Sequence, residues 1–143
     1  MKIVWLEDDL KTIRSSMNYI QEKIGVKAQI CENFSEFSDA LELLEDLPEN
    51  VIIIDIRMLF NMEMIFSCFD KTFHVDEELN GGFEYFKECI EGRFTKAKVL
   101  FFTSKPLEEA KKDARKFNIS TSLIITKDNL HTLLRALRSS HEK

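Results

Sequence analysis

Four short stretches made almost entirely of apolar residues punctuate the chain, at residues 3–6, 51–54, 99–102 and 123–126. Runs without polar alternation are typical of strands covered on both faces, as in a parallel sheet. Residues 26–30 alternate weakly and indicate a fifth, shorter strand at a sheet edge. The pattern therefore predicts five strands, with the β-branched run at residues 51–54 as the central one.

Amphipathic spacing follows each strand and predicts a helix after every one. The first helix ends at Gly25, the second begins at Asn33 with Glu36 as its capping partner, and the fourth begins near Pro106. The apolar positions that define the third and fifth helices are Phe83, Phe86, Ile90, Leu130, Leu133, Leu134 and Leu137. This alternation demands right-handed crossovers, so we expect an α/β fold with a doubly wound five-stranded parallel sheet of order 2-1-3-4-5.

Polar side chains stand where four of the strands end. Glu7 and Asp8 follow the first strand, Asp55 the third, Thr103 the fourth and Lys127 the fifth. With this strand order they are neighbours on one rim of the sheet, where α/β proteins bind ligands. Crowded carboxylates repel unless a cation joins them, and oxygen ligands suit Mg²⁺. A hydroxyl and an ammonium beside that cation complete a cradle for a phosphoryl group, with Asp55 as the nucleophile.

Each of these residues also has a plain structural interpretation when it is taken alone. Asp8 or Asp9 is more often a helix cap than a metal ligand. Thr103 commonly satisfies backbone groups at a strand end, and Lys127 is commonly a solvated lysine. Only their joint occurrence at the right strand ends, in the right order, favours a site.

The composition narrows the class of protein. The 143 residues suffice for a single domain, residues 1–143, whose core needs no disulfide or structural metal. A net charge of -5 spread over mixed signs argues against direct nucleic-acid binding. Cys31, Cys68 and Cys89 follow no metal-binding spacing, so we expect buried reduced thiols. The chain has no 18-residue apolar run and no signal sequence, so we expect a cytoplasmic protein that does not contact the membrane.

At its strand ends the chain resembles the receiver domain of two-component response regulators, the CheY-like (flavodoxin-like) fold. The resemblance covers nearly the whole chain apart from an insertion at about residues 59–80. The segments that carry it are Ile3-Val4-Trp5-Leu6-Glu7-Asp8-Asp9, Ile52-Ile53-Ile54-Asp55-Ile56-Arg57-Met58, Asn80-Gly81-Gly82-Phe83, Phe101-Phe102-Thr103-Ser104 and Ile125-Thr126-Lys127. It implies a phosphoacceptor that serves phosphorelay signalling.

The resemblance also implies the role of each acid. Asp55 would accept a phosphoryl group from a histidine kinase or a phosphotransfer protein. Glu7, Asp8, Asp55 and the main-chain carbonyl of Arg57 would hold Mg²⁺. Such a protein is not an ordinary enzyme, because it catalyses only its own phosphorylation and dephosphorylation.

The resemblance assigns the output to contacts with a downstream protein partner. Thr103 and Lys127 would hold the phosphoryl oxygens, and Thr103 would be drawn toward the phosphate, repacking the face formed by the fourth helix, fifth strand and fifth helix. Two departures from the family pattern affect how phosphorylation would be coupled to this face. Ile124 stands where the family commonly has an aromatic residue, and Asp128 stands where it usually has proline, so Asp128 is expected to cap the last helix.

Two basic residues are a further departure from the family pattern. Arg57 and Lys105 occupy positions that, in the family, flank the route of the attacking water, so we expect them to alter the lifetime of the phosphoryl group. A phosphatase with an aspartyl intermediate has little support, because Arg57 stands where a second carboxylate would be needed two residues after Asp55.

The insertion leaves two alternatives open. Nine of the twelve residues 58–69 are apolar, so the segment must pack on something. It either folds back on the third helix or the sheet edge, or it forms an interface covered by a second copy of the chain or a partner protein. His74 among Asp76, Glu77 and Glu78 is better explained as an acidic solvated turn than as a second metal site.

Two classes of function therefore remain. The first is a phosphoacceptor that acts as a phosphorelay shuttle or by binding a partner. The second is a pseudo-receiver, an interaction module that keeps the fold but is not switched by phosphate, as Ile124 and Asp128 would suggest. The intact acid, threonine and lysine set favours the first.

Overall fold

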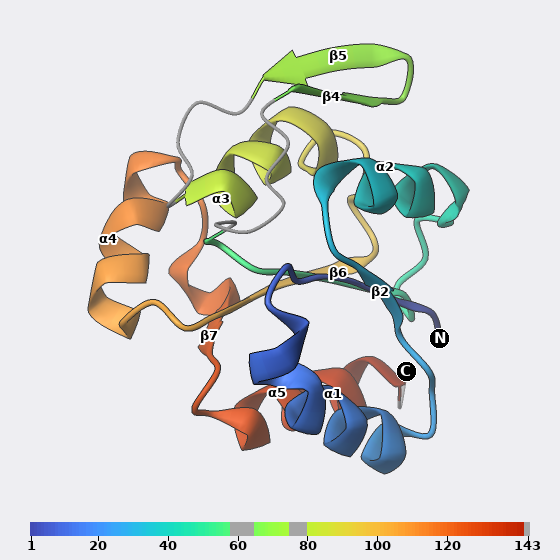
Figure 1. Ribbon diagram of the computed structural model, residues 1–143, viewed down its shortest axis with the longest axis vertical. Helices are drawn as coiled ribbons and strands as arrows, with labels where there is room; N and C mark the ends of the chain where they lie inside the picture. The colour runs from blue at the N-terminus through green and yellow to red at the C-terminus, as the bar shows by residue number, and fades with distance from the viewer. Residues whose placement is uncertain (58–64, 75–79, 142–143) are drawn as a thin grey trace.

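The computed structural model describes residues 1–57, 65–74 and 80–141, and a five-stranded parallel sheet forms its centre (Figure 1). The strands run in the order β2-β1-β3-β6-β7. Their bounds are Ile3–Leu6 for β1, Gln29–Cys31 for β2, Val51–Ile54 for β3, Lys98–Thr103 for β6 and Ile124–Thr126 for β7. Counted within this sheet, the order is 2-1-3-4-5, so the predicted fold class and strand order are confirmed.

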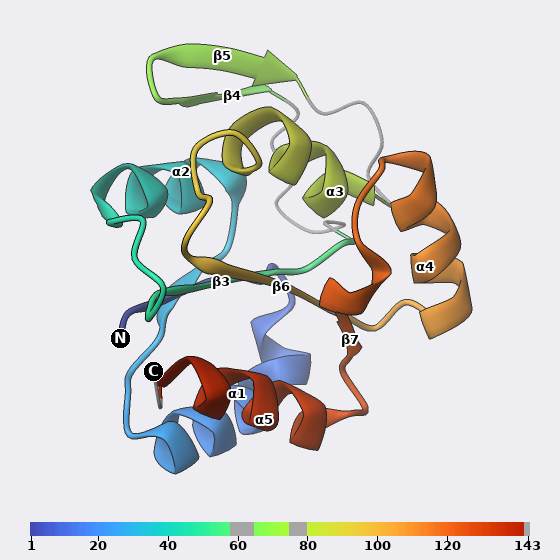
Figure 2. The same cartoon turned by 180° about the vertical axis from the view of Figure 1, so that it is seen from behind.

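Helices cover both faces of the sheet. Figures 1 and 2 show α1 and α5 on one side and α2, α3 and α4 on the other. Their bounds are Leu10–Ile24 for α1, Phe34–Leu43 for α2, Gly81–Tyr85 for α3, Leu107–Lys116 for α4 and Leu130–His141 for α5. No helix in the described part of the chain is both long enough and apolar enough to span a membrane.

Side-chain alternation along the strands divides the interior into two cores. Ile3 and Trp5 of β1 face α1 and α5, whereas Val4 and Leu6 face the opposite core. Trp5 is fully buried, and its ring meets Phe102 of β6 edge to face at 5.8 Å between centroids. All three cysteines are buried and unpaired, as the sequence predicts.

The helix ends follow the predicted signals in most places. The Asn33 side chain accepts the Glu36 N–H at 2.8 Å, and Gly25 ends α1 in the left-handed region at φ 77°. The expectation that Asp128 caps the last helix is wrong. Asn129 takes that position, because its side chain and carbonyl accept the Thr132 N–H, while the Asp128 carboxylate accepts from the Thr126 hydroxyl.

The third helix is shorter than its apolar spacing suggests. After Tyr85 the chain widens into a π-helical turn, η2, over Phe86–Ile90, and a further short 3-10 turn, η3, spans Thr121–Leu123 before β7. A π turn carries one more residue per turn than an α-helix. Cys89 and Ile90, both in this turn, are buried in the core.

Part of the insertion is a β-hairpin, with β4 over Ile65–Cys68 and β5 over Lys71–His74 paired antiparallel (Figure 1). Within the described residues, the hairpin forms a sheet of its own and pairs with no strand of the five-stranded sheet. β4 packs against α2, where the Glu42 carboxylate accepts the Phe69 N–H at 2.6 Å. Contact with the third helix is confirmed, since the Tyr85 hydroxyl donates to Cys68 Sγ at 3.6 Å. Residues 58–64 and 76–78, on which the other predictions for the insertion depend, lie outside the described residues.

Candidate functional site

The pairing of β1 with β3 places the first acids side by side. Leu6 is paired with Ile54, and the Asp55 N–H donates to the Leu6 carbonyl at 3.1 Å. Glu7 and Asp55 therefore leave adjacent strands at the same rim. Parallel strands align their carboxyl ends, which is why residues 48 positions apart meet there.

Three carboxylates converge at this rim. One oxygen from each of Glu7, Asp8 and Asp55 lies within 4.8 Å of the others, and all three residues are buried. Burial raises the pKa of Asp55 well above its usual value, and the negative charge of Glu7 raises it further. Asp55 Oδ1 is buried and accepts no hydrogen bond from any residue that the structure describes. The cluster is thus short of positive charge.

Lys127 supplies part of that charge from the end of β7. Its Nζ lies 2.6 Å from Glu7 Oε1 and 3.5 Å from Asp55 Oδ2. Burial alone would lower the pKa of the ammonium, but the charges of Asp55 and Glu7 outweigh burial and raise it. The Lys127 N–H donates to the Thr103 carbonyl at 2.7 Å, which fixes the end of β7 against the end of β6.

Thr103 is fully buried at the end of β6. Its hydroxyl oxygen accepts the main-chain N–H of Lys105 at 3.0 Å. This bond occupies the oxygen as an acceptor and leaves the hydroxyl hydrogen available for donation. The structure thus brings Glu7, Asp8, Asp55 and Lys127 into one cluster, with Thr103 on the neighbouring strand end and its hydroxyl turned to its own loop.

A cavity of about 670 Å³ lies beside Thr103 and Lys127. The loop after β6 and the loop after β7 form its walls, including Leu107 and Asn129. The rim therefore has open space at the ends of β6 and β7.

Gly82, at the start of α3, explains how the helix can lie so close to Asp55. A Cβ atom at this position would sit 2.1 Å from the Asp55 carbonyl oxygen. The Gly82 N–H donates to the Ile56 carbonyl at 2.9 Å, so the helix start is bonded directly to the chain that follows β3. A larger residue would push this segment away from the acids.

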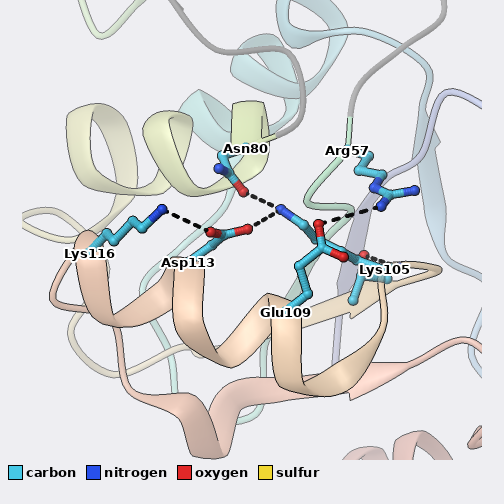
Figure 3. Close-up of polar contacts among 7 residues, drawn as sticks. Arg57, Asn80, Lys105, Glu109, Asp113 and Lys116 are labelled. Atoms are coloured by element: carbon cyan, nitrogen blue, oxygen red, sulfur yellow. Dashed lines mark hydrogen bonds and ion pairs between the residues drawn. The ribbon is translucent and has the colours of Figure 1, made fainter.

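Arg57 and Lys105 both turn toward α4 (Figure 3). Arg57 pairs with Glu109 at 3.9 Å, between partly exposed side chains. Lys105 is only 1% exposed; its Nζ donates to Asn80 Oδ1 at 2.7 Å and to the Asp113 carboxylate. The Lys105 ammonium is thus enclosed between Asn80 and Asp113. Its expected effect on the lifetime of the phosphoryl group stays a prediction.

Sequence reasoning missed Asn80 and Asp113 as partners of this lysine. Asp113 lies on the buried face of α4 beside Ala110 and Ala114, so an acid among small residues at helical spacing was the available signal. Burial would raise the pKa of Asp113, but the hydrogen bond and charge of Lys105 outweigh it and hold that pKa below its usual value.

The donor set at the rim fits Mg²⁺. Three carboxylates supply oxygen ligands only, and Asp55 Oδ1 is a buried acceptor whose partner does not come from the described chain. Zinc sites favour nitrogen and sulfur ligands. Mg²⁺ needs few protein ligands because it keeps several waters, so Glu7, Asp8 and Asp55 form a sufficient set.

Comparison with known proteins identifies the fold. No family model and no curated protein matches the chain. Among solved structures it is similar to the signal receiver domain of a DNA-binding response regulator from Colwellia psychrerythraea, at 16% identity and a TM-score of 0.68 over 100% of this chain and 99% of that one. A response regulator receiver domain from Francisella matches at 15% identity and a TM-score of 0.61, over 99% and 96% of the two chains.

A CheY-like receiver domain protein from Methanospirillum hungatei agrees, at 18% identity and a TM-score of 0.59, over 99% of this chain and 96% of that chain. The chain therefore has the receiver-domain fold, as the resemblance of its strand ends predicts.

Proposed function

We propose that this chain is a phosphoacceptor receiver, which takes a phosphoryl group onto Asp55 and signals through contacts with other proteins. The observation that carries the proposal is the convergence of three buried carboxylates with the Lys127 ammonium at one rim. An arrangement of this kind concentrates negative charge around an acceptor oxygen while keeping a cation beside it. Phosphoryl transfer depends mainly on such positioning and charge neutralisation.

The proposed step is a transfer from a phosphohistidine. An Asp55 carboxylate oxygen attacks phosphorus and forms an O–P bond, while the P–N bond to the donor imidazole breaks. The electron pair returns to the imidazole nitrogen, which takes a proton. With acetyl phosphate as the donor, the P–O bond to the acetyl group breaks instead and acetate leaves. Hydrolysis later reverses the change at Asp55, with water forming the new O–P bond and the carboxylate leaving.

Each side chain at the rim has a part in this proposal. Glu7, Asp8, Asp55 and the main-chain carbonyl of Arg57 would hold Mg²⁺. The bound ion supplies positive charge that offsets the charge of the transferred group. Lys127 reaches Asp55 and would hold one phosphoryl oxygen. Thr103, whose hydroxyl hydrogen is available, would donate to another.

The proposal extends to partners and setting. The donor would be a histidine kinase or a phosphotransfer protein, and the output a downstream protein partner, without direct contact with nucleic acid. The whole chain would act as one domain in the cytoplasm, with a second copy of the chain as a further partner. Catalysis would be limited to its own phosphorylation and dephosphorylation.

A pseudo-receiver that binds partners without phosphorylation is the second candidate. Ile124, which is buried against the core, and Asp128 are the residues that favour it. Both classes require the same fold, so only the acid cluster separates them.

Incubation with acetyl phosphate and Mg²⁺, followed by intact-protein mass spectrometry, tests the proposal. We expect one added phosphoryl group on the parent and none on Asp55→Asn. Asp9→Asn is the matched control, because this acid is next to the cluster in sequence but bonds the exposed Thr12 hydroxyl at 2.7 Å. An unmodified parent would favour the pseudo-receiver. Equal labelling of Asp55→Asn would place the phosphoryl group on another residue and contradict Asp55 as the acceptor.

A further inference from the structure

The loop after β6 contains a buried cation that the proposed chemistry does not use. Lys105 lies two residues after Thr103, yet its ammonium is enclosed between Asn80, which precedes α3, and Asp113 of α4 (Figure 3). Removing a lysine from water is costly unless its charge is paired and its donors are satisfied. A buried charge held in this way fixes the position of the loop that carries it.

The same residue controls the Thr103 hydroxyl through its main chain. The Lys105 N–H donates to Thr103 Oγ1 at 3.0 Å, and both atoms are buried. Rotation of the hydroxyl toward Asp55 must either break this bond or carry the Lys105 backbone with it. Because the ammonium is anchored to Asp113, movement of that backbone is resisted by α4.

We propose that Lys105 is a positioning residue. Its side-chain bonds to Asp113 and Asn80 fix the loop whose main-chain N–H holds the Thr103 hydroxyl. In this way Lys105 couples the direction of that hydroxyl to the position of α4. The inference rests on the proposed function, since it explains how a phosphoryl group on Asp55 changes α4. Coupling of this kind is reciprocal, so α4 also biases Thr103. It gives the chain a route from the site to α4 that needs no aromatic residue at Ile124.

The other charges around this pair lie closer to solvent. Lys116 lies 3.5 Å from Asp113 Oδ1, but its side chain is 65% exposed. Arg57 and Glu109 are 30% and 49% exposed and lie 3.9 Å apart. Exposed pairs contribute little, because water screens them and long side chains lose entropy when they are held. Lys105 is therefore the cation that we expect to carry the coupling.

Four proteins test this inference by amide hydrogen exchange with and without Mg²⁺ and beryllofluoride, a phosphoryl mimic. In the parent, we expect changed exchange both at residues 55–57 and throughout α4. In Lys105→Met and in the double variant Lys105→Met/Asp113→Leu, the change near Asp55 should remain while the change in α4 falls at least fivefold. Lys116→Ala should behave like the parent.

The double variant separates positioning from stability. Replacing a buried ion pair by apolar residues is often neutral or stabilising, so this protein should unfold no earlier than the parent and still lose the α4 response. Without any ligand, the Lys105→Met variant should also lose protection of the residue 105 amide that bonds Thr103.

Three results would overturn the inference: a full α4 response in both Lys105 variants, an equal loss in Lys116→Ala, or undiminished protection of the residue 105 amide in the free protein. If the parent shows no exchange change near Asp55 and takes up no phosphoryl group, the proposed function fails as well. The unliganded amide signal still reports on whether Lys105 holds Thr103.

Discussion

The two ends of the sheet each hold a carboxylate, and the two carboxylates differ in how completely they are hydrogen-bonded. At the amino-terminal end, Asp46 accepts the N–H groups of Thr95, Lys96 and Ala97 at 2.8–3.0 Å, together with the Thr95 hydroxyl. At the carboxyl-terminal end, Asp55 has an oxygen with no hydrogen-bond partner among the described residues and lies beside two other acids. One carboxylate joins the segment before β3 to the segment before β6. The other is crowded and incompletely paired.

The pKa values follow this difference. Burial disfavours the charged form of Asp46, but the backbone hydrogen bonds and the Thr95 hydroxyl together outweigh it and lower its pKa. Burial and Glu7 raise the pKa of Asp55 well above the usual value. Binding sites commonly sacrifice stability in this way, because groups arranged for a ligand are poorly compensated without it.

The largest effect on stability should come from the satisfied carboxylate. Asp46→Ala removes four hydrogen bonds from a partly exposed residue and should lower the free energy of unfolding by about 2 kcal/mol. Urea denaturation at neutral pH measures the change. Asp9→Ala, which removes a half-buried acid bonded to the Thr12 hydroxyl, should stay within about 0.5 kcal/mol of the parent. An equal loss of unfolding free energy in both variants would show that the hydrogen bonds of Asp46 do not contribute the expected stability.

Adding Mg²⁺ should stabilise the folded protein by compensating the crowded acids at the carboxyl-terminal end of the sheet. At ten times the dissociation constant, binding to the folded state alone stabilises the parent by about 1.4 kcal/mol. Thermal unfolding with Mg²⁺ and with EDTA measures this, and K⁺ at matched ionic strength is the control. Asp8→Asn, which removes one carboxylate oxygen from the cluster, should weaken the response. A shift of the same size in Asp8→Asn would place the ion elsewhere.

Neutralising the crowded acid should make the metal-free protein more stable. Asp55→Asn removes repulsion from Glu7 and Asp8, and we expect a gain of about 1 kcal/mol in the free energy of unfolding. Urea denaturation in EDTA is the measurement. A loss of stability instead would mean that the Lys127 pair at 3.5 Å outweighs the repulsion.

The smallest expected effect is on the pH dependence of the free energy of unfolding, measured in EDTA. Because the folded pKa of Asp55 is raised, acidification from neutrality toward 3.8 should add stability, and Asp55→Asn should lack this gain. The folded pKa of Asp46 is lowered, so its contribution is present above 3.8 and is lost as the pH falls below that value. Asp46→Asn should lack that loss. If the unfolding free energies of the parent and both variants changed with pH in parallel, the difference between Asp46 and Asp55 would be contradicted.

Much of the fold and the acid cluster could be predicted from the sequence. Val51–Ile54 has no polar alternation, so it could only be a strand covered on both faces, and its end had to be a rim position. Strand order then determined that Glu7, Asp55 and Lys127 would meet. These inferences succeed because backbone topology alone sets the outcome.

Other features depended on side-chain direction and local backbone, which spacing does not reveal. Lys105 lies near the rim in sequence, but its side chain turns inward because Asp113 is available on α4. The hairpin was missed because its tip, Phe69 and Asp70, has positive φ values of 52° and 62° without glycine or asparagine, the usual signals of such turns. The π turn at η2 likewise has no periodic signature.

The chain contains one tryptophan, and it is the buried Trp5 that packs on Phe102. Trp5 precedes Glu7 by two residues on β1, and its ring packs against Phe102, which directly precedes Thr103 on β6. The single tryptophan therefore contacts both strands that end at the rim. Its emission thus comes from one known environment beneath the acids. Every unfolding or titration experiment described above can be followed without attaching a label.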